Sequence, residues 1–346
     1  MNTTHIDIGL ARYSDWAFTS SVVVLVVALI LLAVELAYAR GRKVEARELV
    51  GATAGTGAAT AATSGTGAAT AATSGRGVGA DSSTPGVIAD TPTRSADERI
   101  GRAGLALVYV GIALLATCIV LRGLATARVP WGNMYEFINL TCFSGLIAGA
   151  IVLRKPQFRA LWVFVLVPVL ILLTVSGRWL YTNAAPVMPA LQSYWLPIHV
   201  SVVSLGSGVF LVGGVASILF LLKMSPLADR DNGFGRMIQR LPDGQTLDRI
   251  AYRTTIFAFP IFGFGVIFGA IWAEEAWGRY WGWDPKETVS FIAWVVYAAY
   301  LHARSTAGWR DRKAAWINVV GFVAMVFNLF FINLVTVGLH SYAGVG

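Results

Sequence analysis

Charged side chains are scarce in this sequence of 346 residues: only 13% are Asp, Glu, Lys or Arg, while 56% are hydrophobic. Soluble globular domains carry about 25% charged residues. The shortage excludes a soluble enzyme with a single membrane anchor. It predicts a protein that crosses a membrane many times, and the mean hydropathy of +0.63 agrees with that class.

Cysteine is nearly absent as well. Cys118 and Cys142 both fall within or beside apolar segments, and the sequence has no CxxC or CxxCH motif. The chain is therefore neither a thiol–disulfide oxidoreductase nor a c-type cytochrome. We expect both thiols to be small packing residues. No Ser–His–Asp set, phosphate loop or zinc motif occurs either, so no catalytic acid or base is predicted.

Eight apolar segments are long enough to cross a bilayer as helices, because a span needs roughly 20 apolar residues. These segments are residues 16–39, 103–122, 136–153, 160–177, 198–222, 254–273, 286–303 and 314–338. The sequence thus predicts an all-α, polytopic membrane helix bundle with about eight transmembrane helices. We divide it into an N-terminal transmembrane anchor (1–40), a linker (41–102) and a seven-helix membrane domain (103–346).

The linker contains a repeat, GTGAATAATS, which begins at Gly55 and again at Gly65. Such sequence lacks the large apolar side chains that offset the entropy cost of ordering. We expect the linker to be mostly disordered and to act as a tether. A docking segment is the alternative.

Arg and Lys are concentrated after the first, third, fifth and seventh apolar segments. The positive-inside rule places these regions in the cytoplasm and both termini on the outer face. The net charge of +8 is then a topology signal at anionic membrane lipid, and no nucleic-acid partner is predicted.

An aromatic stretch, Trp277-Gly-Arg-Tyr-Trp-Gly-Trp-Asp284, lies on the outer face between the sixth and seventh segments. An interfacial belt of aromatic residues explains isolated tryptophans. A belt is diffuse, however, and does not predict three tryptophans in seven positions with glycines between them. Broad apolar rings, with glycines that allow close backbone approach, suit a large flat ligand. Asp284 before Pro285 has the chemistry of a helix N-cap, which alone would explain this carboxylate; a role at the ligand is the second interpretation.

Two of the four histidines, His199 and His340, fall at the outer ends of the fifth and eighth segments, on the side of the aromatic stretch. A lone interfacial histidine is usually a polar group at the lipid headgroups. Two on one face beside tryptophans fit the axial ligation of haem iron.

His302 lies 18 residues after Asp284 on one predicted helix, roughly 27 Å away at 1.5 Å per residue, near the cytoplasmic leaflet. An ionisable residue within a span is a candidate functional residue. No second histidine of this sequence is predicted at that depth, so a six-coordinate haem there would take its other ligand from another protein. The alternative is that His302 merely ends its helix beside Arg304.

These residues resemble the CcsA/ResC family of cytochrome c biogenesis proteins (called CcsB in actinobacteria), in the WWD-domain haem-handling superfamily. Residues 272–288 are similar to the family's external WWD loop, His199 and His340 to its external histidines, and His302 to its transmembrane histidine. Asn133-Met-Tyr-Glu136 resembles a further family motif whose role the sequence does not reveal. The resemblance covers about residues 103–346.

The resemblance implies a multi-pass subunit of the bacterial plasma membrane, acting in System II cytochrome c biogenesis within a holocytochrome c synthase (haem lyase) complex. Haem b, the transported substrate, would bind His302 and a histidine of a CcsB/ResB-type membrane protein, and then pass to the outer site. There the CxxCH thiols of apocytochrome c, kept reduced by a thioredoxin-like thiol reductase, would add to the haem vinyl groups. The residues implied to contact haem at the outer site are His199, Trp272, Trp277, Arg279, Tyr280, Trp281, Trp283, Asp284 and His340.

Two other classes of function are weighed against this one. An exporter of haem or of a small solute would be expected to carry charged groups in mid-membrane, but the spans are nearly free of them. An electron-transfer subunit with permanent haem would place paired histidines at both leaflets, and the single His302 argues against that arrangement.

Overall fold

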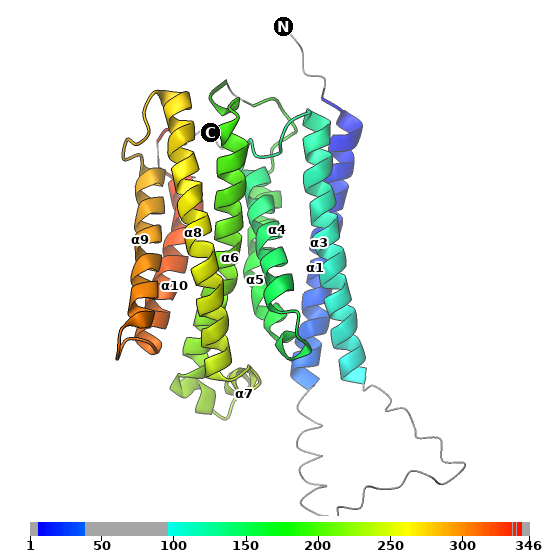
Figure 1. Cartoon of the computed structure of the whole chain (residues 1–346). Helices are drawn as coiled ribbons and strands as arrows, with labels where there is room; N and C mark the ends of the chain where they lie inside the picture. Colours follow the sequence, from blue (N-terminus) through cyan, green and yellow to red (C-terminus); the bar gives the residue numbers. More distant parts are fainter. Residues whose placement is uncertain (1–5, 39–95, 188, 334, 337, 341–346) are drawn as a thin grey trace, which may run out of the picture.

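The computed structural model is a bundle of helices that lie side by side (Figure 1). It describes residues 6–38, 96–187, 189–333, 335–336 and 338–340. The α-helices within these ranges are α1 (Ile8–Tyr38), α3 (Ala96–Thr126), α4 (Met134–Val152), α5 (Leu161–Trp179), α6 (Trp195–Lys223), α7 (Gly233–Gln239), α8 (Gly244–Trp277), α9 (Pro285–Ser305) and α10 (Arg312–Phe327). Short helical turns are η1 (Pro156–Phe158), η2 (Pro189–Leu191), η3 (Pro226–Asp229) and the π-helical turn η4 (Asn328–Ile332).

Seven segments of the described chain are helices long and apolar enough to cross a membrane: α1, α3, α4, α5, α6, α8, and α10 together with η4. The prediction of an all-α polytopic membrane bundle is therefore confirmed. The predicted span 286–303 forms α9, which lies beside α8 and α10 (Figure 1). This helix is less apolar than the other seven because Lys286 and Glu287 begin it and His302 and Arg304 lie in its last turn.

Some helix boundaries differ from those predicted. α3 begins at Ala96, inside the predicted linker 41–102, and the linker up to residue 95 lies outside the described residues. The last span, predicted over 314–338, is helical only to the π-turn η4. The side chain of Asn333 donates hydrogen bonds to the carbonyls of Asn328 and Leu329 there, which satisfies helix-end acceptors. The described residues after Asn333, which are 335–336 and 338–340, form turns and bends instead.

The N-terminal helix is part of the bundle, because α1 packs along α3. The hydroxyl of Ser21 donates to the carbonyl of Gly111 over 2.8 Å, and Ser14 donates to the carbonyl of Cys118 over 3.0 Å. Small polar residues and glycines let membrane helices approach closely and hydrogen-bond across their interface. Cys118 is buried here, and Cys142 is buried in the core of the bundle, as expected for packing residues.

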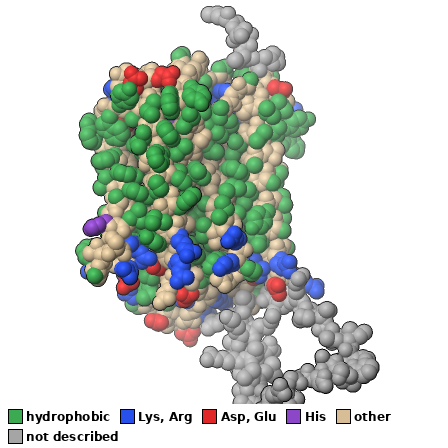
Figure 2. All heavy atoms as spheres, in the orientation of Figure 1, with side chains coloured by type: hydrophobic (Ala, Val, Ile, Leu, Met, Phe, Trp, Pro, Cys, Tyr) green, Lys and Arg blue, Asp and Glu red, His purple; other side chains and the backbone are tan. Residues whose placement is uncertain are grey.

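α6 occupies the centre of the remaining helices and packs against α4, α8 and α10 (Figure 1). Gly208 of α6 lies directly on the backbone of Gly145 of α4, where a β-carbon would overlap it. The two ends of the bundle differ in composition. Figure 2 shows Lys and Arg gathered toward the end of the bundle where α1 ends and α3 begins; we call this the basic end. The opposite end, which carries residues 277–284, is the aromatic end.

Candidate functional site

A cavity of about 400 Å³ lies among α4, α5, α6, α8, α9 and α10 and reaches the aromatic end. Its size is in the range of 300–1,000 Å³ found for sites of organic ligands. Most of its lining is apolar. The aromatic and imidazole rings that line it include Trp131, His199, Trp272, Trp277, Tyr280, Trp281 and His340.

Trp272 is the ring around which the two predicted iron ligands meet. It is 1% exposed. The ring centroid of His199 lies 6.0 Å from that of Trp272, with the planes only 12° apart, and that of His340 lies 5.9 Å away. Trp277 contacts both Trp272, at 4.8 Å, and His340, at 5.2 Å. Residues from α6, from α8 and from the segment after η4 are thereby brought to one place.

The orientation of His199 is fixed by the backbone of α8. Its Nδ1 lies 2.8 Å from the carbonyl oxygen of Gly265. A carbonyl only accepts, so Nδ1 carries the hydrogen and Nε2 carries the lone pair. Gly269, one turn further along α8, makes room for the ring, because a β-carbon there would lie 2.6 Å from Cε1 of His199.

His340 is oriented by a carboxylate. Its Nδ1 lies 2.8 Å from Oδ2 of Asp284, and the backbone N–H of Leu339 donates to Oδ1 of the same residue over 2.8 Å. Gly338 allows this approach, since a β-carbon there would lie 2.7 Å from Oδ1 of Asp284. Metal-binding histidines typically donate their second ring N–H to a carboxylate or a carbonyl, and the two histidines show one example of each arrangement.

The protonation states follow from burial and hydrogen bonding. Burial on its own would raise the pKa of the Asp284 carboxyl, but hydrogen bonds from His340 and from the backbone of Leu339 outweigh it and lower this pKa to about 2. Burial lowers the pKa of His340, although Asp284 opposes the shift. At pH 7 the pair is therefore a carboxylate beside a neutral imidazole, with the lone pair on Nε2.

Asp284 has a second role as the N-cap of α9, as its position before Pro285 predicts. Its side chain accepts from the backbone N–H of Lys286 over 3.2 Å, and Glu287 accepts in return from the N–H of Asp284 over 3.1 Å. This capping box satisfies orphan donors at the helix start. One carboxylate thus both begins α9 and holds His340.

The aromatic stretch is a shorter loop than the predicted 272–288. α8 continues to Trp277. It ends where Gly278 adopts a left-handed φ of 68° and its backbone N–H donates to the carbonyl of Glu274 over 2.7 Å. Pro285 then begins α9. Only residues 278–284 lie outside the two helices, so Trp272 and Trp277 are held on a rigid element.

Only some of the remaining residues of the predicted outer site line the cavity. Tyr280 and Trp281 line it, although Tyr280 is also 62% exposed. Trp283 has a left-handed φ of 57°, rare for a bulky residue, and its side chain is 67% exposed. Neither Trp283 nor Arg279 is among the described residues that line the cavity. Arg279 instead lies 3.6 Å from a carboxylate oxygen of Glu287.

His302 lies at the other end of α9 from Asp284 and does not line the cavity. Its side chain is exposed, and its backbone carbonyl accepts from the hydroxyls of Ser305 and Thr306. Within the described ranges, its ring has no hydrogen-bond partner. The structure thus separates it from the two histidines at the aromatic end.

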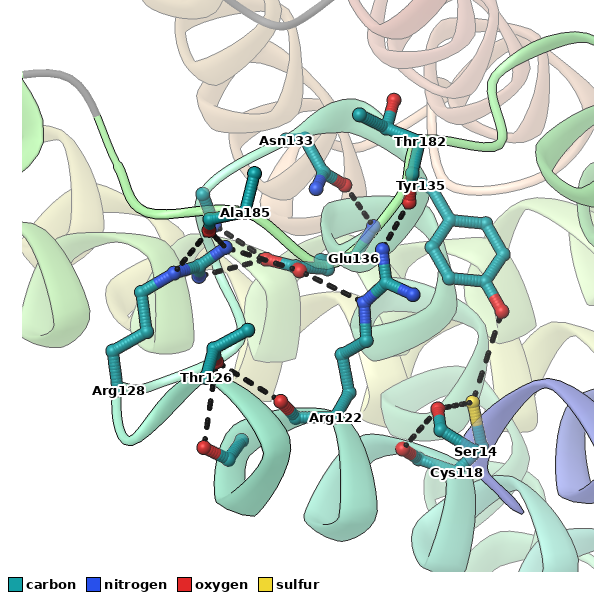
Figure 3. Close-up of polar contacts among 12 residues, drawn as sticks. Ser14, Cys118, Arg122, Thr126, Arg128, Asn133, Tyr135, Glu136, Thr182 and Ala185 are labelled. Atoms are coloured by element: carbon teal, nitrogen blue, oxygen red, sulfur yellow. Dashed lines mark hydrogen bonds and ion pairs between the residues drawn. The ribbon is translucent and has the colours of Figure 1, made fainter. Parts of the chain in front are cut away.

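A buried charged cluster was not predicted from the sequence (Figure 3). The carboxylate of Glu136 accepts from Nε of Arg122 over 3.2 Å, from Nη1 of Arg128 over 3.0 Å and from the backbone N–H of Gly132 over 2.7 Å. The side chains of Arg122 and Glu136 are 2% and 1% exposed. Asn133 caps α4 by accepting from the N–H of Glu136.

This charged cluster fixes one wall of the cavity. Arg122 also donates to the carbonyl of Thr182, and Arg128 donates to that of Ala185 over 3.0 Å (Figure 3). Through Glu136, the two arginines therefore join α3, α4 and the segment after α5. The loop held between them carries Trp131, Gly132 and Asn133, which line the cavity. This contact gives the Asn133-Met-Tyr-Glu136 motif a structural role. A sequence signal was present in Arg122 and Glu136, two opposite charges at adjacent ends of predicted spans.

Comparisons with known proteins match most of this chain. Residues 131–340 match a family model described as cytochrome C assembly protein. The chain is 35% identical over 258 residues to the cytochrome c biogenesis protein CcsA of Guillardia theta, which covers 68% of this chain and 85% of that protein. It is 34% identical to CcsA of Parasynechococcus marenigrum (strain WH8102), covering 70% and 87%, and 32% identical to CcsA of Gloeobacter violaceus (strain ATCC 29082 / PCC 7421), covering 70% and 86%.

Proposed function

The chain belongs to the CcsA family of cytochrome c assembly proteins, and on that premise we propose that its cavity holds haem between His199 and His340 for attachment to apocytochrome c. In this proposal haem b is the substrate. One observation carries the proposal: His199 and His340 are oriented in the same way. Each has Nδ1 beside a hydrogen-bond acceptor, and both rings lie against Trp272.

The residues of the cavity fit such a ligand. Two neutral imidazoles with lone pairs on Nε2 are suitable axial ligands for iron. Trp131, Trp277 and Trp281 offer broad apolar faces for a porphyrin. The chain's own contribution is axial ligation, burial and orientation, while the reactive vinyl groups belong to haem.

Attachment at this site needs positioning more than acid–base catalysis. Each thiol of the apocytochrome CxxCH motif adds across a vinyl double bond, with sulfur bonding to one carbon and hydrogen to the other. Holding thiol and vinyl group in place can supply several kcal/mol through proximity alone. A thioredoxin-like thiol reductase keeps the thiols reduced, and the histidine of CxxCH replaces one of the two axial ligands. The chain is thus a positioning subunit of a haem lyase.

In the proposed orientation the aromatic end faces the outside of the bacterial plasma membrane and the basic end the cytoplasm. The band of Lys and Arg at the basic end supports this through the positive-inside rule (Figure 2). His302 then receives haem near the inner leaflet, and a CcsB/ResB-type membrane protein supplies the second histidine. The exposure of the His302 side chain supports a ligand that is completed by another chain.

Absorption spectra of the purified protein test the outer site. In a haem-producing host the wild-type chain should carry a low-spin spectrum. His199→Gly and His340→Gly should each lose it, and added imidazole should restore it by filling the space of the lost ring. His302→Gly is the matched control, and without the partner protein its spectrum should equal that of wild type.

An unchanged spectrum in both His199→Gly and His340→Gly would remove these residues as iron ligands. Cytochrome c maturation in a reporter host, with and without the partner protein, separates the proposed function from its alternatives. A haem exporter, a small-solute exporter or a permanent electron-transfer subunit would leave thioether formation unaffected when the two histidines are replaced.

A further inference from the structure

The cavity contains a positive charge that forms no ion pair with the described carboxylates, although Glu287 lines the same cavity. Lys286, in the first turn of α9, is the one Lys or Arg among the described residues that line the cavity. Its Nζ donates to the amide oxygen of Asn333 and lies 5.5 Å from the centre of the Phe137 ring. Both contacts are with neutral groups, and neither cancels a charge.

The two nearest acidic residues in sequence are committed elsewhere. Oxygens of Asp284 accept from His340, from the N–H of Leu339 and from the backbone, not the side chain, of Lys286. Glu287 accepts from the backbone of Gly282 and of Asp284 and lies 3.6 Å from Arg279. Lys286 forms no ion pair with a carboxylate in the part of the chain that the structure describes.

A cation in a mostly apolar cavity is costly unless an anion joins it. A second donor lines the same cavity: the buried Nε1 of Trp131 has no hydrogen-bond partner among the described residues, and Trp131 and Phe137 pack against the same hydrophobic cluster. An ammonium and an indole N–H that line the same cavity are donors suited to a carboxylate.

We propose that Lys286 binds a propionate carboxylate of the porphyrin in this cavity, with Trp131 as a second donor, and so fixes the rotation of the porphyrin in its own plane. The inference rests on the proposed function and adds a specificity for the acidic edge of the ligand. Two axial histidines alone leave the ring able to turn about the line joining them. One charge-assisted contact at its rim removes that freedom and determines which way the vinyl edge points.

Two other cations near the aromatic end, Arg279 and Arg178, do not serve this role. Arg279 is outside the described lining and pairs with Glu287, and Arg178 is exposed and does not line the cavity. Lys286 also follows Asp284 by only two residues. The N-cap Asp284, which holds His340, therefore lies two residues before the proposed propionate contact at the start of the same helix.

The test compares haem with haem whose two propionates are methyl esters, using the full-length protein and optical titration. Wild type should bind haem about ten-fold or more tightly than the ester, the order expected for a hydrogen bond to a charged group. Lys286→Met should lose that preference by weakening haem and leaving the ester unchanged, and Lys286→Arg should retain most of it. Lys313→Met, an exposed lysine near Trp309 at the basic end, is the control and should behave as wild type.

The spectrum separates this inference from the proposed function. Lys286→Met should still give the low-spin spectrum, because both histidines remain. If wild type binds haem in a histidine-dependent, low-spin form but does not distinguish it from the ester, the propionate contact is wrong and the haem site stands. If Lys286→Met weakens both porphyrins equally, Lys286 is a structural residue. If no histidine-dependent spectrum forms in wild type, the proposed function itself fails.

Discussion

The two ends of this bundle hold histidine in opposite ways. At the aromatic end, His199 and His340 have Nδ1 beside a carbonyl and a carboxylate, and both rings border a cavity. At the basic end, His302 is exposed, and no described residue orients its ring. An oriented ligand needs no further ordering when iron arrives, whereas an unsupported one has to be fixed by whatever binds it. Under the proposed function, the aromatic end would be a complete haem site and the basic end half of one.

The largest expected effect concerns the charges that support each end. Glu136→Ala would leave the buried Arg122 with only Asp15, at 3.6 Å, and the partly buried Arg128 with no carboxylate among the described residues. This should lower the free energy of unfolding by about 3–5 kcal/mol. The matched change at the basic end is Asp248→Ala, which breaks the pair with Arg304, where the two side chains are 14% and 22% exposed. Loss of such a partly exposed pair should cost about 1 kcal/mol or less.

Thermal and denaturant unfolding in detergent, followed by tryptophan fluorescence, measures both variants. Equal losses would show that the charged cluster supports the aromatic end no more than an ordinary ion pair would. Glu136→Ala should also weaken haem binding, because the wall carrying Trp131 is no longer held.

An intermediate effect is expected from a single methyl group beside His199. In Gly269→Ala the new β-carbon would lie 2.6 Å from the imidazole, so the ring has to leave the Gly265 carbonyl or the helices have to move apart. Overpacking of this kind costs about 1–3 kcal/mol, and haem affinity should fall roughly ten- to hundred-fold. Gly308→Ala is the control: with φ of 78° and no atom within 4 Å, it strains the turn before α10 without touching the cavity.

Optical haem titration compares the haem affinity of these two glycine variants. A loss of affinity in Gly308→Ala as large as in Gly269→Ala would mean that haem binding reports general stability, not the placement of His199.

The smallest effect on stability, with a clear effect on haem, is expected for Asp284→Asn. Asparagine caps helices as well as aspartate does, so α9 should still begin normally. The loss of a charged partner of a metal-binding histidine typically reduces affinity by about 10–100-fold. In Asp284→Asn the haem affinity should therefore fall while the free energy of unfolding stays close to that of wild type. Haem titration and unfolding of the same preparation measure the two quantities. A parallel fall in both would assign Asp284 to capping alone.

The pH dependence of stability gives a second test of Asp284→Asn. The pKa of Asp284 is lowered to about 2 from its ordinary value of 3.8, so its carboxylate stabilises the folded protein above pH 3.8. That contribution is lost as the pH falls toward 2. The unfolding temperature of wild type should drop more steeply than that of Asp284→Asn over this interval, and identical slopes would contradict the lowered pKa.

The sequence alone predicts the helical bundle, because each long apolar run has no other way to satisfy its backbone in lipid. It also predicts that His199, His340 and the tryptophans share one end, since this depends only on counting spans. It does not predict that Trp272 lies between the histidines or that Trp283 points outward. Those details depend on where α8 ends and how residues 278–284 turn.

The charged cluster was missed for a related reason. Arg122 and Glu136 sit at the ends of neighbouring helices, and the sequence shows each as a residue at a membrane boundary. Their pairing depends on how closely α3 approaches α4 and on the carbonyls of Thr182 and Ala185, which come from a distant segment. Tertiary contacts of this kind leave no periodic signal.

The double role of Asp284 has a mechanical consequence. α9 is one continuous helix with Asp284 at its start and His302 in its last turn, so it connects the two ends of the bundle. A rotation or shift of α9 imposed at His302 moves the carboxylate that holds Nδ1 of His340. A displacement of α9 as one body at its exposed histidine would therefore reach the Asp284–His340 hydrogen bond roughly 27 Å away, at 1.5 Å per helical residue.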